Sequence, residues 1–207
     1  MIKKYILFGA FLWSFACAQA QEVIIHVSQG YLDTLYHKYP VKPFVHPGFS
    51  NCFEWDTPYF QSIADVKQHQ ALVVHGVYTR QMAKTADSLN FARKGQMAAW
   101  RHLPDMPNED GVYRAANQDR TGTSKMDKGH FSAWKLNAYN QDAALLSDTY
   151  TFNAAFEMAA QNIGTELGIE YLQRFLVGEV KGRHRPAGLP LYKRVEYWKG
   201  AWPLLVR

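Results

Sequence analysis

The sequence predicts a single α+β domain, because two short runs rich in Val and Ile precede a segment with helical periodicity. The runs are residues 22–27 (EVIIHV) and residues 71–78 (ALVVHGVY), and each is bounded by polar or turn-forming residues, as strands usually are. In residues 161–177 apolar side chains recur every three or four positions, which is typical of a helix with one buried face. No longer period repeats along the chain, and this excludes solenoid folds.

Residues 1–20 are predicted to be a cleaved secretory signal peptide. Two lysines precede an apolar run over residues 5–16, and Ala18 and Ala20 supply the small side chains of a cleavage site. The run gives only about 18 Å of helix, well short of the roughly 30 Å hydrocarbon core, which disfavours a membrane anchor. A lipoprotein signal at Cys17 is the weaker alternative, because Ser rather than the usual Leu stands three positions before it. We expect a secreted or periplasmic protein.

The remaining loops, the helix and the last strand are predicted from the positions of Pro and Gly and from hydrophobic periodicity. Residues 39–58 contain four prolines, which predicts an irregular surface segment between the two strands. Residues 103–128 are polar and interrupted by Pro and Gly, which indicates a long loop of the kind that often serves function. The helix of residues 161–177 is followed by a basic turn at residues 181–185, either a solvated turn or a nucleic-acid contact, and residues 191–198 are predicted to form a last strand.

Composition sets further bounds on the class of protein. The chain has 207 residues, of which 47% are hydrophobic and 20% charged, as in folded globular proteins. Loss of the two signal-peptide lysines lowers the net charge from +5 to +3, which is only weak support for a polyanionic partner. The same cleavage would remove Cys17 and leave Cys52 alone, so we expect Cys52 to be buried and inert.

One segment carries the residues that suit catalysis. Residues 127–130 read Asp-Lys-Gly-His, and Asn162 follows His130 by 32 positions. Asn153 lies nine positions before Asn162, whereas Glu170 and Arg174 lie eight and twelve positions after it. Taken alone, each of these side chains has an ordinary structural explanation, such as a helix cap or an i,i+4 ion pair.

The combined spacing resembles the secreted DNA/RNA non-specific endonucleases, a family of ββα-metal or His-Me finger nucleases. That family has an Asp-Arg-Gly-His motif, then an Asn nine residues ahead of a metal-binding Asn, and a Glu and an Arg on the same helix. The resemblance implies a central antiparallel sheet with a ββα-metal finger active site, and it makes residues 21–207 a DNA/RNA non-specific endonuclease domain. A weaker resemblance extends toward the N-terminus as far as the segment of Arg93, which is similar to an arginine-bearing loop of the family.

The resemblance also implies a role for each residue of the site. His130, Lys128, Glu170 and Arg174 would be catalytic, and Lys128, Arg174 and Arg93 would contact DNA or RNA. Asn162 would bind the metal, with Asp127 and Asn153 as supporting residues.

These residue types suit phosphodiester hydrolysis independently of the family. A free imidazole titrates near pH 6.5, so His130 is well suited to take a proton from an attacking water. A hard divalent cation stabilises the charge that develops on the phosphate oxygens. The amide oxygen of Asn162 is a ligand that leaves other positions to waters and phosphate, as Mg²⁺ prefers. Because no Cys/His cluster with zinc spacing occurs, we expect Mg²⁺ or Mn²⁺.

Helical geometry leaves one assignment open. At 100° per residue, Glu166 lies about 40° around the helix from Asn162, whereas Glu170 lies about 80° away. Periodicity therefore allows either carboxylate near the metal, and only the spacing of the family favours Glu170. Arg174 lies one turn after Glu170 and is positioned to pair with it.

Several positions depart from the family pattern. Lys128 replaces the usual Arg, which exchanges a planar fork that binds phosphate at two points for a single charge. Residues 131–134 read Phe-Ser-Ala-Trp where the family continues Leu-Ala-Pro, and Glu166 replaces a Trp. We therefore weigh two functions: a secreted, metal-dependent endonuclease without sequence specificity, and a catalytically weak or inactive relative that binds nucleic acid or a protein.

Overall fold

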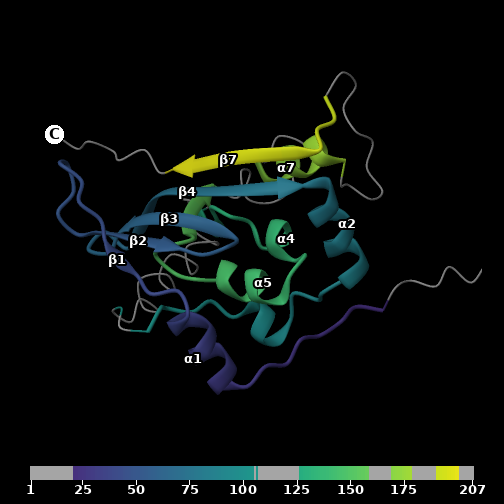
Figure 1. The fold of residues 1–207 in the computed structure, drawn as a ribbon, viewed down its shortest axis with the longest axis horizontal. Helices are drawn as coiled ribbons and strands as arrows, with labels where there is room; N and C mark the ends of the chain where they lie inside the picture. Colours follow the sequence, from purple (N-terminus) through teal and green to yellow (C-terminus); the bar gives the residue numbers. More distant parts are fainter. Residues whose placement is uncertain (1–20, 105, 107–125, 159–168, 179–189, 201–207) are drawn as a thin grey trace, which may run out of the picture.

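The computed structural model describes residues 21–104, 106, 126–158, 169–178 and 190–200. In this part of the chain a five-stranded antiparallel sheet has the order β1-β2-β3-β4-β7, and a second sheet pairs β5 with β6 (Figure 1). The strands are β1 (Lys42–Pro43), β2 (Cys52–Asp56), β3 (Phe60–Asp65), β4 (Gln70–Thr79), β5 (Met126–His130), β6 (Ala154–Met158) and β7 (Arg194–Gly200). The predicted α+β class with an antiparallel sheet is confirmed.

Short helices pack around the large sheet, and polar side chains cap the starts of three of them. They are α1 (Gln29–His37), α2 (Arg80–Leu89), the 3₁₀ helix η1 (Gly95–Ala98), α4 (Trp134–Asn137), α5 (Gln141–Ser147) and α7 (Ile169–Val177). Ser28, Thr79 and Asn140 accept backbone hydrogen bonds at the starts of α1, α2 and α5. Within the described ranges no helix has the length and apolar character needed to cross a bilayer.

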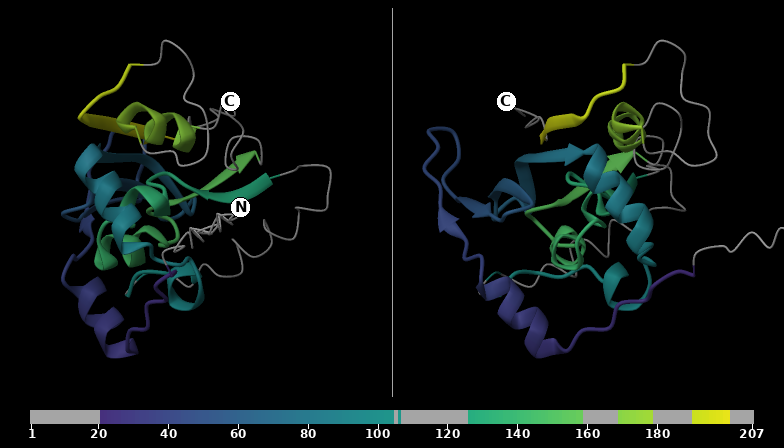
Figure 2. Two further views of the ribbon diagram at one scale, coloured as in Figure 1. Left: turned by 90° about the vertical axis from the view of Figure 1, so that its right-hand side faces the viewer. Right: turned by 45° about the vertical axis from the view of Figure 1, so that its right-hand side comes forward.

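The main core lies between the large sheet and the α4–α5 segment. Trp55 of β2 is fully buried, and its ring meets Phe60 and Phe152 edge to face, with ring centroids 5.5 and 5.8 Å apart. Leu145 and Leu146 of α5 pack into the same cluster. Figure 1 shows α4 and α5 on one face of the sheet and α7 beside β7, and Figure 2 shows the β5–β6 ribbon extending away from the large sheet.

The strand assignments from the sequence have mixed outcomes. Residues 71–78 lie within β4, and residues 194–198 of the predicted last strand lie in β7. Residues 22–27 are not a strand, because only Val23 pairs with a neighbour, through an isolated bridge to Phe91. Val23 and its neighbour Ile24 are 45% and 47% exposed, so this apolar run follows the surface instead of entering the sheet.

The predictions for irregular and helical segments are also partly corrected. The Pro-rich segment of residues 39–58 contains β1 and β2, and the buried side chains of Cys52 and Trp55, on opposite faces of β2, anchor that strand. Helix α7 covers residues 169–177 of the predicted helix, whereas residues 161–168 lie outside the described ranges. The signal peptide, most of the 103–128 loop and the basic turn also lie outside them.

Candidate functional site

His130 is the last residue of β5, and its surroundings hold it firmly. It pairs with Ala154 in the β5–β6 ribbon, and only 8% of the residue is exposed. Its carbonyl oxygen accepts a hydrogen bond of 2.8 Å from Lys199 Nζ of β7. The backbone of His130 is therefore tied to both sheets.

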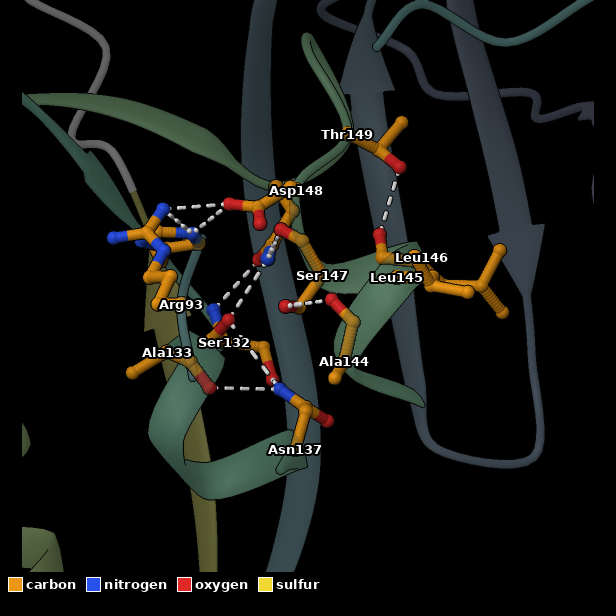
Figure 3. Close-up of polar contacts among 12 residues, drawn as sticks. Arg93, Ser132, Ala133, Asn137, Ala144, Leu145, Leu146, Ser147, Asp148 and Thr149 are labelled. Carbon is orange, nitrogen blue, oxygen red and sulfur yellow. Dashed lines mark hydrogen bonds and ion pairs between the residues drawn. The ribbon is translucent and has the colours of Figure 1, made fainter. Parts of the chain in front are cut away.

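The imidazole of His130 belongs to a three-residue ionic cluster. Its Nε2 lies 2.7 Å from Oδ1 of Asp148, and the same oxygen accepts a 2.7 Å bond from Nη2 of Arg93. Arg93 Nη2 lies 3.3 Å from His130 Nε2. Figure 3 shows Arg93 pointing toward Asp148. The Asp148 side chain is fully buried, whereas 40% of the Arg93 side chain is exposed, so Arg93 links the buried carboxylate to solvent.

The ionic pairing fixes which imidazole nitrogen carries hydrogen. Asp148 pairs with the guanidinium of Arg93, and a carboxylate in such an ion pair accepts hydrogen bonds and donates none. His130 Nε2 must then donate to Asp148, and the lone pair of the neutral ring lies on Nδ1. This tautomer makes Nδ1 the atom that can accept a proton.

Asp148 follows α5, a position that would be unfavourable without partners. The carboxylate lies next to the negative end of the helix dipole, in a place from which water is excluded. Arg93 and His130 supply the donors that compensate Oδ1, whereas Oδ2 is buried with no hydrogen-bond partner among the residues that the structure describes. The site thus contains a buried charge whose neutralisation depends on Arg93.

Trp100 covers one face of the imidazole. Its ring centroid lies 4.4 Å from that of His130, and its other stacking partner is Tyr150 at 5.7 Å. The next residue, Arg101, donates its backbone N–H to the carbonyl of Asp148 at 2.9 Å and accepts a bond from Tyr150 N at 2.7 Å. These bonds place the Trp100 segment and the Asp148 segment side by side, so the stacking is fixed by backbone pairing.

A buried amide network supports the chain immediately after His130. Asn153 Oδ1 accepts from Ser132 N at 2.6 Å, and Asn153 Nδ2 donates to the carbonyls of Ser132 and Ser147 at 2.8 and 2.6 Å. Asn137 Nδ2 donates to Ser132 Oγ at 2.8 Å, and Figure 3 shows these contacts converging on Ser132. Asn153 therefore holds the His130 segment against the end of α5, which is a supporting position.

The network continues into β7 through Tyr197. Its phenol lies 2.7 Å from Ser132 Oγ, and burial raises the pKa of this phenol far above its ordinary value, so it remains protonated. Tyr197 pairs with Gly76 of β4, and a Cβ at position 76 would collide with the phenol. The lack of a side chain at Gly76 thus leaves the space in which the Tyr197 phenol reaches Ser132.

The other residues singled out from the sequence are placed only in part. Asp127 and Lys128 precede His130 on β5, with backbone pairing to β6, and their side chains lie outside what the structure describes. Asn162 lies outside the described ranges. Glu170 is in the first turn of α7 and Arg174 in its last turn.

Helix α7 packs most closely against β4, β7 and α2. Among the residues whose side chains the structure describes, the predicted site residues Arg93 and His130 are in direct contact.

Sequence reasoning missed Asp148 and Trp100. Asp148 carried one usable signal, since it is the one acidic residue of the otherwise apolar and hydroxyl-bearing stretch 143–152 (AALLSDTYTF). An acid in such a stretch is usually buried and paired. Its partner could not be identified, because His130 and Arg93 lie 18 and 55 positions away and reach it only through the tertiary fold.

The described donor set does not make Asp148 a metal ligand. Among the residues that the structure describes, no group of three His, Cys, Asp or Glu side chains could hold a metal ion. Asp148 already accepts from Arg93, whose positive charge would repel a cation at the same carboxylate. A cation at this site would have to be held by other oxygen donors, and Asn162, the expected ligand, lies outside the described ranges.

No family model, curated protein or solved structure matches the chain.

Proposed function

We propose that the protein is a divalent-metal-dependent endonuclease that hydrolyses phosphodiester bonds of DNA and RNA without sequence specificity, with His130 as the general base. The observation that supports this most is the 2.7 Å contact between His130 Nε2 and the buried carboxylate of Asp148. Asp148 holds Nε2 as the donor, which leaves the Nδ1 lone pair for a water proton. In addition, β5 pairs with β6 across the intervening helices α4 and α5, which makes a two-stranded ribbon that ends at His130.

In this proposal side chains of the protein activate the attacking water, stabilise the imidazolium that forms and attract the phosphate backbone. His130 Nδ1 takes a proton from water as the oxygen attacks phosphorus, and the Asp148 carboxylate stabilises the imidazolium that forms. Arg93 neutralises Asp148 and, through its exposed part, attracts the phosphate backbone. Lys128 and Arg174 are proposed as further phosphate contacts.

The proposed metal chemistry rests on residues near α7. Asn162 would hold Mg²⁺ or Mn²⁺ directly, and Glu170 would orient a water bound to the cation. The cation would supply stabilisation for the charge that develops on phosphate oxygens. Asn162→Ala should raise the Mg²⁺ concentration needed for half-maximal rate, and comparison of Glu166→Gln with Glu170→Gln decides between the two carboxylates.

The direct test is nicking of supercoiled plasmid and cleavage of single-stranded RNA by the purified protein, in Mg²⁺ and in EDTA. We expect cleavage of both substrates that EDTA abolishes, and a rate about 10²- to 10⁴-fold lower in His130→Gln. A folded protein that binds DNA but cleaves neither substrate with Mg²⁺ or Mn²⁺ would instead be the inactive, binding relative. Activity retained by His130→Gln would remove His130 from the mechanism.

A further inference from the structure

Contacts at both ends hold the His130 side chain, but they leave one of its movements open. The backbone is held by pairing with Ala154 and by the hydrogen bond from Lys199 Nζ, and Nε2 lies 2.7 Å from Oδ1 of Asp148. With Cα and Nε2 both fixed, the ring can still turn about the line that joins these two atoms, because the χ2 torsion of histidine has broad energy wells. Nδ1 lies off that line, so this movement changes the direction of its lone pair.

Trp100 is placed to restrict this movement. Its ring centroid lies 4.4 Å from that of His130, and the two ring planes are inclined by 30°. If the imidazole turned toward the indole it would collide with it, and if it turned away the stacking contact would be lost. The lone pair of Nδ1 lies in the imidazole plane, so an indole against the face of that ring does not cover the lone pair.

The indole can restrict the imidazole because its own position is fixed. Tyr150 stacks on Trp100 with ring centroids 5.7 Å apart and with planes inclined by only 17°. The next residue, Arg101, donates its backbone N–H to the carbonyl of Asp148 and accepts a bond from Tyr150 N. The indole and the carboxylate that contact His130 therefore come from two segments that are bonded to each other.

A second histidine shows how an imidazole plane is fixed by hydrogen bonds alone. His75 Nδ1 lies 3.3 Å from Gln61 Oε1, and His75 Nε2 lies 2.9 Å from Glu196 Oε1. Partners at both nitrogens define the plane of a ring. Among the residues that the structure describes, His130 has such partners at Nε2 and none at Nδ1, so its plane needs a constraint of another kind.

We propose that Trp100 is a positioning residue that holds the imidazole plane of His130 and so directs the Nδ1 lone pair to one place. The proposal rests on the proposed nuclease function for its catalytic meaning, whereas the mobility of the imidazole is measurable without cleavage. A displacement of about 1 Å in a reacting group can lower a rate about 100-fold. Loss of the stack should therefore slow the chemical step and leave substrate binding nearly unchanged.

The first test is NMR relaxation of the imidazole carbon–hydrogen bonds in the purified protein in EDTA. In the wild type we expect an order parameter of about 0.85 for His130, as in rigid groups, and below about 0.6 for the exposed His26. Trp100→Leu should lower the His130 value below about 0.6, whereas Trp100→Phe, which keeps a flat ring, should leave it near the wild-type value. An equally rigid His130 ring in Trp100→Leu would overturn the proposal. A wild-type His130 ring as mobile as that of His26 would also overturn it, and this comparison needs no variant to fold.

The second test is steady-state cleavage of plasmid by the same variants in Mg²⁺. Trp100→Leu should lower kcat about 10- to 100-fold with KM within about twofold, and Trp100→Phe should restore most of the rate. Trp198→Leu, which removes the indole stacked on His75, is the matched control and should change neither kcat nor the order parameter of His130. A mobile His130 ring with unchanged kcat would overturn the positioning role. Absence of cleavage by the wild type would refute only the proposed nuclease, and the relaxation data would then decide whether Trp100 holds the ring.

Discussion

Two clusters of the molecule repeat one arrangement: a histidine paired with a carboxylate, an arginine on the same carboxylate, and a tryptophan stacked on the imidazole. The buried cluster consists of Arg93, Trp100, His130 and Asp148, and the exposed cluster consists of His75, Arg194, Glu196 and Trp198. The His–carboxylate distances are nearly the same, 2.7 Å in the buried cluster and 2.9 Å in the exposed cluster. The stacking distances, 4.4 and 4.6 Å, are also similar.

The clusters differ in their access to water. The side chains of His130 and Asp148 are 7% and 0% exposed, whereas those of His75 and Glu196 are 28% and 33% exposed. Water and salt can replace each contact of the exposed cluster, so its pairs contribute little to stability. In the buried cluster nothing replaces a lost partner. The two clusters are therefore alike in contact geometry, and burial of the carboxylate partner is the property that distinguishes His130 from His75.

The largest expected difference between the clusters is in catalytic rate. Asp148→Asn keeps the side-chain shape but removes the carboxylate that fixes the His130 tautomer, so we expect cleavage to slow by about 10²- to 10⁴-fold. Glu196→Gln is the matched change in the exposed cluster and should leave the rate within about twofold. Initial rates of plasmid nicking at one ionic strength measure both. Equal rates for the two variants would remove Asp148 from the mechanism.

The second expected difference is in the free energy of unfolding. Arg93→Gln leaves the Asp148 carboxylate buried without its cation, and we expect a loss of about 1.5–3 kcal/mol. Arg194→Gln removes the corresponding arginine from an exposed carboxylate and should change stability by no more than about 0.5 kcal/mol. Urea unfolding of the three proteins at neutral pH gives both values. A larger loss for Arg194→Gln would reverse the comparison.

The third expected difference concerns the stacked tryptophans. Trp100 contacts both His130 and Tyr150, so Trp100→Leu should lower the free energy of unfolding by about 1–2 kcal/mol. Trp198 is 65% exposed, and Trp198→Leu should have an effect within about 0.5 kcal/mol. Thermal and urea unfolding of both variants provide the measurement. Indistinguishable losses would mean that the two stacks contribute alike despite their different surroundings.

The smallest effect is a change in the titration of Glu196. The hydrogen bond from His75, followed by the charge of Arg194, holds the Glu196 pKa below its ordinary value, and partial desolvation acts in the opposite direction. His75→Phe should therefore raise the Glu196 pKa toward its ordinary value, and Arg194→Gln should raise it less. Carboxyl NMR titration measures each shift, and an unchanged pKa in His75→Phe would contradict the assigned cause.

The sign of the linked stability follows from the direction of that shift. A carboxyl whose pKa is lower in the folded state stabilises the fold above its unfolded pKa. This contribution is lost as the pH falls through the folded pKa of Glu196. It should therefore be absent in strong acid and complete at neutral pH.

Sequence reasoning succeeded where local pattern decides structure. Residues 74–78 alternate between buried and half-buried positions along β4, as the Val-rich run predicted, and the alternation is interrupted at residues 72–73 opposite a register shift in β3. Residues 22–27 have a similar composition, yet they lack strand neighbours, and composition cannot show whether a neighbour exists. Helix α5 was missed because it has seven residues and is buried on nearly every side, which removes the periodic signal of an amphipathic helix.

The candidate site was predictable only in part, through the residues that belong to a sequence motif. Motif spacing singled out His130, and a weaker likeness singled out Arg93. Asp148, which joins them, has no motif, and its role exists only because the end of α5 lies beside β5. The site could be located from sequence through its histidine, but the partner that fixes the imidazole required the three-dimensional structure.

The contacts that β7 makes determine when the surroundings of His130 can form as the chain is synthesised. Lys199 binds the carbonyl of His130, and Tyr197 binds Ser132, so two side chains of β7 close the frame around a residue made about 70 positions earlier. A chain emerging from the ribosome or crossing a membrane in extended form has β5 before it has β7. The contacts of the His130 segment with β7 therefore form only after residue 199 has emerged and paired, whereas β5 can pair with β6 earlier.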